Sequence, residues 1–430
     1  MGEGGYVILT NGTPYRWKRS DQNSYQMKHW DFPEVIDAGK VPRVYVEFSQ
    51  GAFKKRSDTS GSVKYSLEGT KCSFTIHVRD DDERLWVKLD AIESAGNSRG
   101  SEIQLGWRHD ECITFVLSGK EGEFHTSNPP VDWMQKCRGT LGHRPLSQIC
   151  MLGTHDSGMS TTSHSLVPVS VIDPYVLCQS EDIHGQLLKG ARYFDIRPQL
   201  YKGEWCTGHY TGKVGARGES ISSIIDGVNK FTKNNGELII INFSHSLQSD
   251  VEEWREFNKD EWHSLMKELL KLDHLFIETD NGKAAVVCII EEWGNMSLGD
   301  YAHKGFYKSA QFNVRNEYSN KDETDIMVSD QLEKMKGHMS AHDKRLFLLS
   351  WTLTQQVPEW IGSVRSLADS VGDALKPIKV LAKDCNKELF TRLLPEVSEK
   401  SFPNVVYIDY LNNTEYLALV IAINDKVFNN

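Results

Sequence analysis

The chain has 430 residues, of which 39% are hydrophobic and 25% are charged, the balance of a globular protein with a sizeable core. This length favours two domains over one. The formal net charge of −10 argues against nonspecific binding to nucleic acid and against purely electrostatic attachment to membranes.

No run of apolar residues is long enough to cross a bilayer, and the first residues, MGEGGY, lack the hydrophobic core of a signal peptide. We therefore expect a protein that is cytoplasmic, or secreted without a recognisable signal peptide, and peripheral to membranes. The eight cysteines show neither a CxxC motif nor a cysteine–histidine spacing typical of zinc. Cys150, Cys178 and Cys288 lie in or beside apolar runs, which predicts buried, reduced thiols.

Residues 1–128 have the pattern of an all-β domain. Short β-branched or aromatic segments alternate with turns marked by glycine and asparagine. Several strands at this spacing predict a β-sandwich-like accessory domain, and the pattern resembles that of small membrane-active sandwiches such as the aegerolysins. A packing or substrate-orienting role is favoured over membrane binding. The expected strands are 6–9, 43–48, 63–67, 72–78 and 112–117.

A polar stretch, 121–130, has the composition of a linker, so we expect the second domain over residues 129–430. In this part strand-like segments alternate with amphipathic helical segments, the signature of βαβ units and a parallel sheet. At least six such strands favour a TIM-like (β/α) barrel over an open sheet, so the predicted fold class is α/β. The expected strands are 148–152, 192–196, 237–243, 285–290, 345–350 and 404–410, and the expected helices include 219–232, 259–272 and 325–335.

Polar residues suited to acid–base chemistry follow the first two of these strands. The segment MLGTHDSG places His155 and Asp156 where the chain leaves a buried strand. About forty residues later the segment ARYFDIR alternates, so that Asp195 and Arg197 share one face. His209 follows in a stretch rich in glycine and threonine. The carboxyl ends of parallel barrel strands meet at one edge, and catalytic residues gather there.

The three motifs, in this order and at this spacing, resemble the X domain of phosphatidylinositol-specific phospholipase C, of the metal-independent kind, from about Leu141 to the C-terminus. The resemblance implies cleavage of phosphatidylinositol, or a related inositol phospholipid, to diacylglycerol and a cyclic inositol phosphate. In calcium-dependent relatives the strand end that corresponds to Arg197 is acidic and binds the metal. Arginine there implies chemistry with no metal and no other cofactor. A phospholipid substrate also implies transient contact with a membrane surface, and the oligomeric state stays open.

The resemblance gives the two histidines complementary roles. His155 would take the proton of the inositol 2-hydroxyl, and His209 would protonate the departing diacylglycerol. Imidazole suits both tasks because it titrates near neutral pH. Arg197 would neutralise the charge that develops on the phosphoryl oxygens.

Three carboxylates complete the expected catalytic group. Asp195 lies on the same strand face as Arg197 and can orient it or bind the leaving-group side. Asp156 could reach Arg197 or His209. Asp409 ends the last predicted strand, and the first and last strands of a closed barrel are neighbours. Asp409 is therefore expected beside His155, where it would hold the tautomer of the imidazole.

Four further residues at strand ends are expected to bind substrate. His245 follows the third strand, where members of the family often carry a lysine that contacts the phosphate. Glu291 and Trp293 follow the fourth strand, and Trp351 follows the fifth. Carboxylates bind sugar hydroxyls and aromatic rings stack on sugars, but packing explains both tryptophans equally well.

Two alternatives remain open. A glycerophosphodiesterase or sphingomyelinase D-like enzyme would use the same barrel with a metal held by strand-end carboxylates, and Arg197 argues against it. A non-catalytic lipid- or glycan-binding protein would be favoured if either His155 or His209 pointed away from the pocket.

Overall fold

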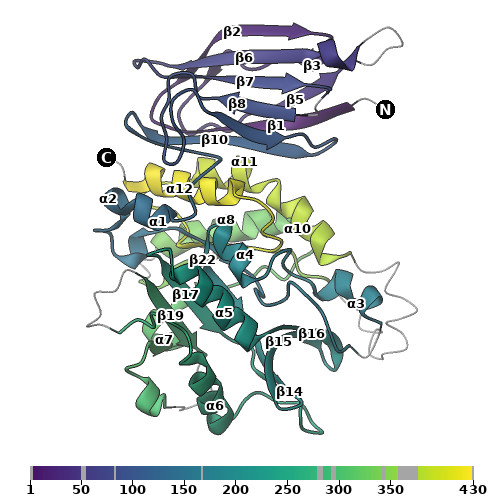
Figure 1. Cartoon of the computed structure of the whole chain (residues 1–430), viewed down its shortest axis with the longest axis vertical. Helices are drawn as coiled ribbons and strands as arrows, with labels where there is room; N and C mark the ends of the chain where they lie inside the picture. The colour runs from purple at the N-terminus through teal and green to yellow at the C-terminus, as the bar shows by residue number, and fades with distance from the viewer. Residues whose placement is uncertain are drawn as a thin grey trace. The chain divides into compact units, whose positions relative to one another are not determined.

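The computed structural model describes residues 3–49, 55–81, 84–165, 168–277, 284–291, 297–340, 344–356 and 376–428. The chain divides into two compact units, whose elements are labelled in Figure 1. Unit 1 contains Met1–Pro130, Lys387–Phe402 and Thr414–Asn430, and unit 2 contains Val131–Asn386 and Pro403–Asn413.

Unit 1 is a two-sheet β structure. Its strands are β1 Glu3–Gly12, β2 Trp17–Tyr25, β3 Met27–Trp30, β4 Val35–Ile36, β5 Arg43–Phe48, β6 Ser60–Leu67, β7 Ser73–Arg79, β8 Arg84–Lys88, β9 Glu102–Gly106, β10 Cys112–Lys120 and β11 Glu123–Thr126. One sheet has the order β11-β10-β1-β5-β3 and the other β4-β2-β6-β7-β8-β9. Both contribute to one core, in which the ring centroid of Phe74 lies 4.9 Å from that of Trp17 and 5.0 Å from that of Phe115. The predicted β-rich N-terminal region is therefore present.

Helix α12, Glu415–Phe428, belongs to unit 1, whereas the predicted division assigned residues 129–430 to the barrel. Its apolar run, residues 417–423, is buried throughout, and the helix lies beside β10 (Figure 1). The carboxylate of Asp425 accepts a hydrogen bond from Ser118 Oγ at 2.8 Å and lies 2.9 Å from His125 Nδ1. A helix with so wide an apolar surface must be shielded from water, and the strands of the sandwich pack against it. Helix α11, Leu389–Leu393, also falls in unit 1.

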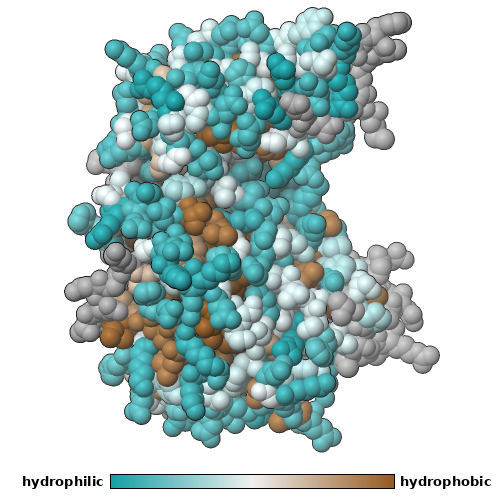
Figure 2. Space-filling model, viewed as in Figure 1, coloured by the Kyte–Doolittle hydropathy of each residue, from teal (hydrophilic) through white to brown (hydrophobic). Residues whose placement is uncertain are grey.

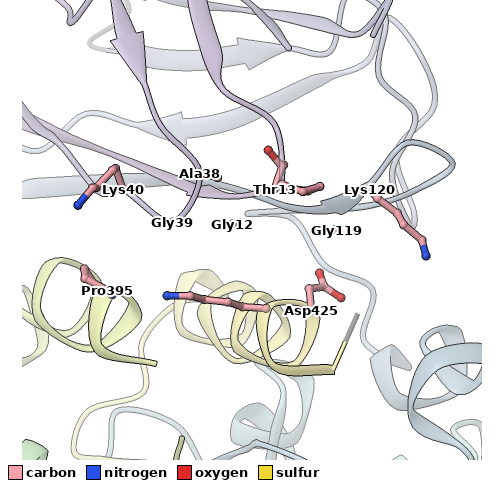
Figure 3. Close-up of a pocket in the computed structure, with 11 residues that line it drawn as sticks. Gly12, Thr13, Ala38, Gly39, Lys40, Gly119, Lys120, Pro395 and Asp425 are labelled. Atoms are coloured by element: carbon pink, nitrogen blue, oxygen red, sulfur yellow. The ribbon is translucent and has the colours of Figure 1, made fainter. Parts of the chain in front are cut away.

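Beside Asp425, unit 1 encloses a cavity of about 360 Å³ (Figure 3). The ammonium group of Lys426 donates a hydrogen bond to the carbonyl of Leu394 at 2.7 Å. Burial, and the nearby charge of Lys40, lower the pKa of Lys426. The lining residues include none of the predicted catalytic or substrate-binding residues, so this cavity is separate from the candidate site.

Unit 2 is built on a curled sheet of eight parallel strands. They are β12 Met151–Thr154, β13 Ala191–Ile196, β17 Leu238–Phe243, β19 Ala285–Ile290, β20 Phe306–Lys308, β21 Val314–Asn316, β22 Leu346–Trp351 and β23 Val405–Ile408, in the order β20-β19-β17-β13-β12-β23-β22-β21. The predicted TIM-like α/β fold is confirmed at this level, and all six expected strands are present. Among the described residues the sheet does not close between β20 and β21. The sheet is a half-barrel whose two edge strands, β20 and β21, have three residues each.

Helices lie on the outer side of this sheet, with α4 and α5 over its face in Figure 1. The expected helices correspond to α5, α6 and α8. In α5 the buried residues Ile221, Ile224, Ile225 and Val228 follow helical spacing, and Ser220 caps the N-terminus by accepting a hydrogen bond from Ser223 N at 3.1 Å. In the described part of unit 2 the α-helices are α1 Trp133–Lys136, α2 Arg138–Leu141, α3 Val169–Val176, α4 Ile183–Leu188, α5 Ile221–Thr232, α6 Lys259–Leu269, α7 Ser309–Phe312, α8 Thr324–Ser340 and α10 Ile378–Asn386.

A smaller sheet of unit 2 has the order β16-β15-β14-β18, with β14 Pro198–Tyr201, β15 Glu204–Thr211, β16 Val214–Ser220 and β18 Leu247–Gln248 in chain order. His209 therefore lies in a strand of a hairpin, whereas the sequence placed it in a loop.

The inward side chains of the curled sheet form an apolar layer below a polar one. The apolar layer is Met151, Tyr193, Ile240, Val287, Ile289, Leu348, Val405 and Tyr407. Gly153 also lies in this layer. A larger residue would not fit there, because its Cβ would come within 2.6 Å of Val405 Cγ1. Side chains alternate along a strand, so the inward positions further toward the carboxyl ends carry His155, Asp195, Arg197 and Asp409. The packed floor thus positions a polar rim at the carboxyl ends of the strands.

No helix in the described part of the chain is long and apolar enough to cross a membrane. Hydrophilic residues predominate on the face shown in Figure 2, with hydrophobic residues in smaller groups among them.

A buried ion pair in unit 2 gives a stability prediction. Arg192 Nε lies 2.9 Å from Glu237 Oε2, and both side chains are 0% exposed. Glu237 also accepts hydrogen bonds from the backbone of Met134 and Gln135. Glu237→Ala leaves the Arg192 charge uncompensated, so the free energy of unfolding should fall by about 3–5 kcal/mol in urea denaturation.

The matched control is Glu204→Ala. The Glu204 carboxylate lies 2.9 Å from Arg217 Nη2, but the Glu204 side chain is 67% exposed. The loss of unfolding free energy should stay below about 1 kcal/mol. Equal losses in the two variants would contradict the structural role of the buried pair.

Candidate active site

The polar rim encloses a cavity of about 420 Å³ in unit 2. This volume is typical of small-molecule sites. The lining includes five of the six residues predicted to be catalytic, namely His155, Asp195, Arg197, His209 and Asp409. The sixth, Asp156, is fully buried.

His155 and Asp409 meet because β12 and β23 pair. The backbone N–H of His155 donates to Ile408 O at 3.0 Å, which extends the pairing by one residue. His155 Nδ1 then lies 2.8 Å from Asp409 Oδ1, across 254 residues of sequence. The structure thus places Asp409 where the fold argument put it. Asn386 of α10 donates to the carbonyl of Asp409 at 2.9 Å and helps to hold this strand end.

The tautomer of His155 follows from its other neighbour. Arg197 Nη2 lies 2.7 Å from His155 Nε2. A guanidinium group only donates hydrogen bonds, so Nε2 accepts and the proton of the neutral ring sits on Nδ1, facing Asp409. Burial lowers the pKa of His155, but the charge and hydrogen bond of Asp409 offset this effect, and the net pKa lies above its ordinary value.

Asp195 is held as an anion that positions Arg197. Its Oδ2 accepts a hydrogen bond from Tyr407 Oη at 2.7 Å and lies 3.3 Å from Arg197 Nε, and its Oδ1 accepts from Ser244 Oγ at 2.8 Å. Burial raises the pKa of Asp195, but Arg197, His155 and the Tyr407 hydroxyl lower it by more, to well below its usual range. Sequence reasoning missed Tyr407, although strand alternation puts it on the same face as Asp409.

His209 makes its contacts in the described part of the chain through Nδ1, which leaves Nε2 for the cavity. Nδ1 lies 3.3 Å from Val176 O and 3.6 Å from both Asp156 Oδ2 and Cys178 Sγ. Burial and the charges of Arg197 and His155 lower the pKa of His209 to about 3. His209 and His155 line the same cavity, and the contacts of Nδ1 leave the Nε2 of His209 available for proton transfer.

Asp156 is fully buried beside His209, with a left-handed backbone conformation and a raised pKa. Its φ of 39° lies in the left-handed region, and its backbone N–H donates to Asp195 Oδ2 at 3.2 Å. Burial raises the pKa of Asp156 to about 7. Arg197 Nη1 is 3.6 Å from its Oδ2. Asp156 therefore keeps its proton to a higher pH than an ordinary aspartate does, and its Oδ2 lies 3.6 Å from His209 Nδ1.

Two of the four predicted substrate-binding residues, His245 and Glu291, line the cavity. The backbone N–H of His245 donates to Glu291 Oε2 at 2.5 Å. Trp293 lies outside the described residues. Tyr318, which the sequence analysis did not select, also lines the cavity and is 59% exposed. It offers an aromatic face to a ligand.

Trp351 packs outside the cavity instead of contacting substrate. Its side chain is fully buried, and its Nε1 donates to the carbonyl of Cys385 in α10 at 2.9 Å. Ser350 and Thr352 line the cavity. Alternation along the strand therefore turns the intervening tryptophan to the other face, which corrects the sequence-based expectation.

No protein-family model and no curated protein matches the chain. Among solved structures, the phosphatidylinositol-specific phospholipase C of Staphylococcus aureus aligns with a TM-score of 0.48 and 17% identity, over 70% of this chain and 98% of its own. A mutant of that enzyme gives 0.49 and 15%, over 70% and 97%. The enzyme from Listeria monocytogenes gives 0.44 and 17%, over 66% and 97%. These identities and TM-scores are too low to support a conclusion about activity.

Proposed function

We propose that the chain is a metal-independent phosphodiesterase that cleaves phosphatidylinositol, or a related inositol phospholipid, to diacylglycerol and a cyclic inositol phosphate. The observation that carries the proposal is the arrangement of His155 between Asp409 and Arg197 at the cavity wall. Asp409 fixes the proton on Nδ1, which makes Nε2 a base. Arg197 touches that same nitrogen, so a phosphate next to the base would meet the guanidinium group.

In the first step His155 Nε2 removes the proton of the inositol 2-hydroxyl, and the oxygen attacks phosphorus within the same molecule. The phosphorus–oxygen bond to diacylglycerol breaks, and His209 Nε2 protonates the leaving oxygen. Arg197 exchanges its contact with His155 for the phosphoryl oxygens, on which negative charge develops. The attacking group is already tethered, which is worth an effective molarity on the order of 10⁵ M or more.

The acid is the Asp156–His209 pair as a unit. A bound phosphodiester offsets the positive charge of Arg197, which is one cause of the low pKa of His209. The shared proton can then pass from Asp156 to His209 and on to the leaving oxygen. Because the Asp156 pKa is about 7, the pair loses its proton as the pH rises, and turnover should decline above that pH.

The cavity supplies groups for the inositol ring. The Glu291 carboxylate can accept hydrogen bonds from ring hydroxyls, His245 can contact the phosphate side, and Tyr318 can cover one face of the ring. The lipid tails would stay with the bilayer, so the protein would contact the membrane surface transiently and remain peripheral to it. Arg197 itself occupies the position between Asp156 and Asp195 where a catalytic metal would bridge these two carboxylates, which disfavours the metal-dependent alternatives.

The proposal is tested by the release of inositol phosphates from phosphatidylinositol vesicles, with phosphatidylcholine vesicles as the control. Phosphatidylcholine has no hydroxyl that could attack its own phosphorus, so only the inositol lipid should be cleaved. Chelation of divalent cations should leave the rate intact or higher. Loss of activity with chelator, restored by calcium, would refute the metal-free mechanism.

Asp409→Asn tests the role of the His155 partner. The substitution removes the negative charge that raises the pKa of His155, so the rise of activity on the acid side should move to lower pH. Turnover should fall on the order of 100-fold or more, with little change in KM. The measurement is the pH dependence of kcat, with Asp226→Asn on the exposed face of α5 as the control. An unchanged acid limb would contradict the assignment.

A further inference from the structure

Three potential metal ligands meet at His209, and the proposed reaction gives no role to one of them, the thiol of Cys178. Cys178 Sγ and Asp156 Oδ2 each lie 3.6 Å from His209 Nδ1. The three ligand atoms all lie within 4.8 Å of one another. Thiolate, imidazole and carboxylate are the ligands that zinc takes in proteins.

The spacing fits a tetrahedral ion. Bonds of about 2.3 Å to sulfur and about 2.0–2.1 Å to nitrogen and oxygen place neighbouring ligand atoms about 3.3–3.6 Å apart. The separations from His209 Nδ1 to Cys178 Sγ and to Asp156 Oδ2, 3.6 Å each, match two edges of such a tetrahedron. Small side-chain adjustments would complete the third edge, and a water could take the fourth position.

A second observation points to a ligand at the same place. Asp156 is 0% exposed, and neither of its carboxylate oxygens has a hydrogen-bond partner among the described residues. A buried carboxylate without such partners is costly, and a cation bound to Oδ2 would reduce that cost. A rival set shares Cys178 but uses His155 and Asp409, whose 2.8 Å hydrogen bond a metal would have to break. The set with the unsatisfied carboxylate is therefore the better site.

We propose that Asp156, Cys178 and His209 form a site for a thiophilic divalent cation, with Zn²⁺ as the reference ion, and that occupancy inhibits the enzyme. The inhibition rests on the proposed function, whereas the binding does not. Three carboxylates and one arginine make the surroundings net negative, which favours a dication despite Arg197. Calcium, which takes oxygen ligands, should not bind. The ion can enter through the cavity that His209 lines.

The inhibition follows from which ring nitrogen the ion would bind. His209 Nδ1 faces Asp156 Oδ2 at 3.6 Å, and an ion on that nitrogen blocks any transfer of a proton from Asp156 to the ring. The leaving diacylglycerol oxygen then lacks a proton donor, so turnover should fall by at least about 10-fold at saturation.

Cobalt(II) titration of the chelator-treated full chain tests the binding directly, because a thiolate ligand gives a charge-transfer absorption and tetrahedral geometry gives intense visible bands. We expect one Co²⁺ per chain, displaced by Zn²⁺ but not by Ca²⁺. Cys178→Ser should abolish the charge-transfer band, and Asp156→Asn should weaken binding. Cys288→Ser, which changes a thiol buried in β19, should leave the spectrum unchanged.

Circular dichroism shows whether each variant is folded. If Cys178→Ser does not fold, the weaker Co²⁺ binding expected of the isosteric Asp156→Asn tests the site instead. Absence of the charge-transfer band in the wild-type chain, or its persistence in folded Cys178→Ser, would overturn the site. Equal inhibition by Zn²⁺ of wild type and Cys178→Ser would overturn its role. If the wild-type chain gives the expected Co²⁺ charge-transfer band but does not cleave phosphatidylinositol, the metal site is supported and the proposed function is rejected.

Discussion

Replacing His155 with alanine should lower the turnover of phosphatidylinositol by at least about 100-fold while the fold survives. The ring is the only group in the described part of the cavity wall that joins a carboxylate on one nitrogen to an arginine on the other. Its removal takes away the base and the orientation that Asp409 provides. The measurement is kcat on vesicles together with circular dichroism, and exposed His143→Ala is the control. Near-normal turnover in folded His155→Ala would exclude it as the base.

His209→Ala distinguishes the acid from the base. If His209 protonates the leaving oxygen, its loss should matter little for an inositol phosphate ester with a good leaving group such as nitrophenolate, which needs no proton. His155→Ala should stay impaired on both substrates, because the attacking hydroxyl is the same. Equal losses for His209→Ala on the natural lipid and on the activated ester would contradict the assignment of the acid.

The second large effect is expected for Arg197→Ala, which should cost about 3 kcal/mol or more of transition-state stabilisation, roughly 100-fold or more in kcat/KM. Arg197 bridges three groups, lying 2.7 Å from His155 Nε2, 3.3 Å from Asp195 and 3.6 Å from Asp156. Its loss leaves two buried carboxylates without their cation, so this variant should also be less stable.

Arg197→Lys separates these two consequences. Lysine keeps the charge, so stability should largely return, but its single ammonium group cannot make the paired hydrogen bonds of a guanidinium group. Turnover should therefore recover only in part. The matched control is Arg217→Ala, whose partner Glu204 is exposed. Full activity in folded Arg197→Ala would remove the arginine from the reaction.

Strand alternation explains why much of the catalytic group could be predicted from the sequence. His155, Arg197 and Asp409 each follow a strongly apolar strand at an inward position, and parallel strands bring such positions together. The pairing of β12 with β23 then joins residues 254 apart. The same rule applied strictly would have excluded Trp351 and selected Tyr407.

Other features depend on contacts that no local pattern encodes. Helix α12 follows the last strand of the sheet as a barrel helix would, yet its buried Asp425 bonds to the sandwich. Cys178 was expected to be a buried thiol, and it is buried, but its distance to His209 depends on where a segment after α3 meets a separate hairpin. The three-residue strands β20 and β21 are too short to show a period.

The central claim is that the inositol hydroxyl itself attacks phosphorus without a metal. The most direct measurement is phosphorus NMR of the first product formed from phosphatidylinositol, in oxygen-18-labelled water with chelator present. We predict a cyclic inositol phosphate that contains no oxygen from water. A first product that is acyclic and carries the water label, or a reaction that begins only when a divalent cation is added, would contradict the account.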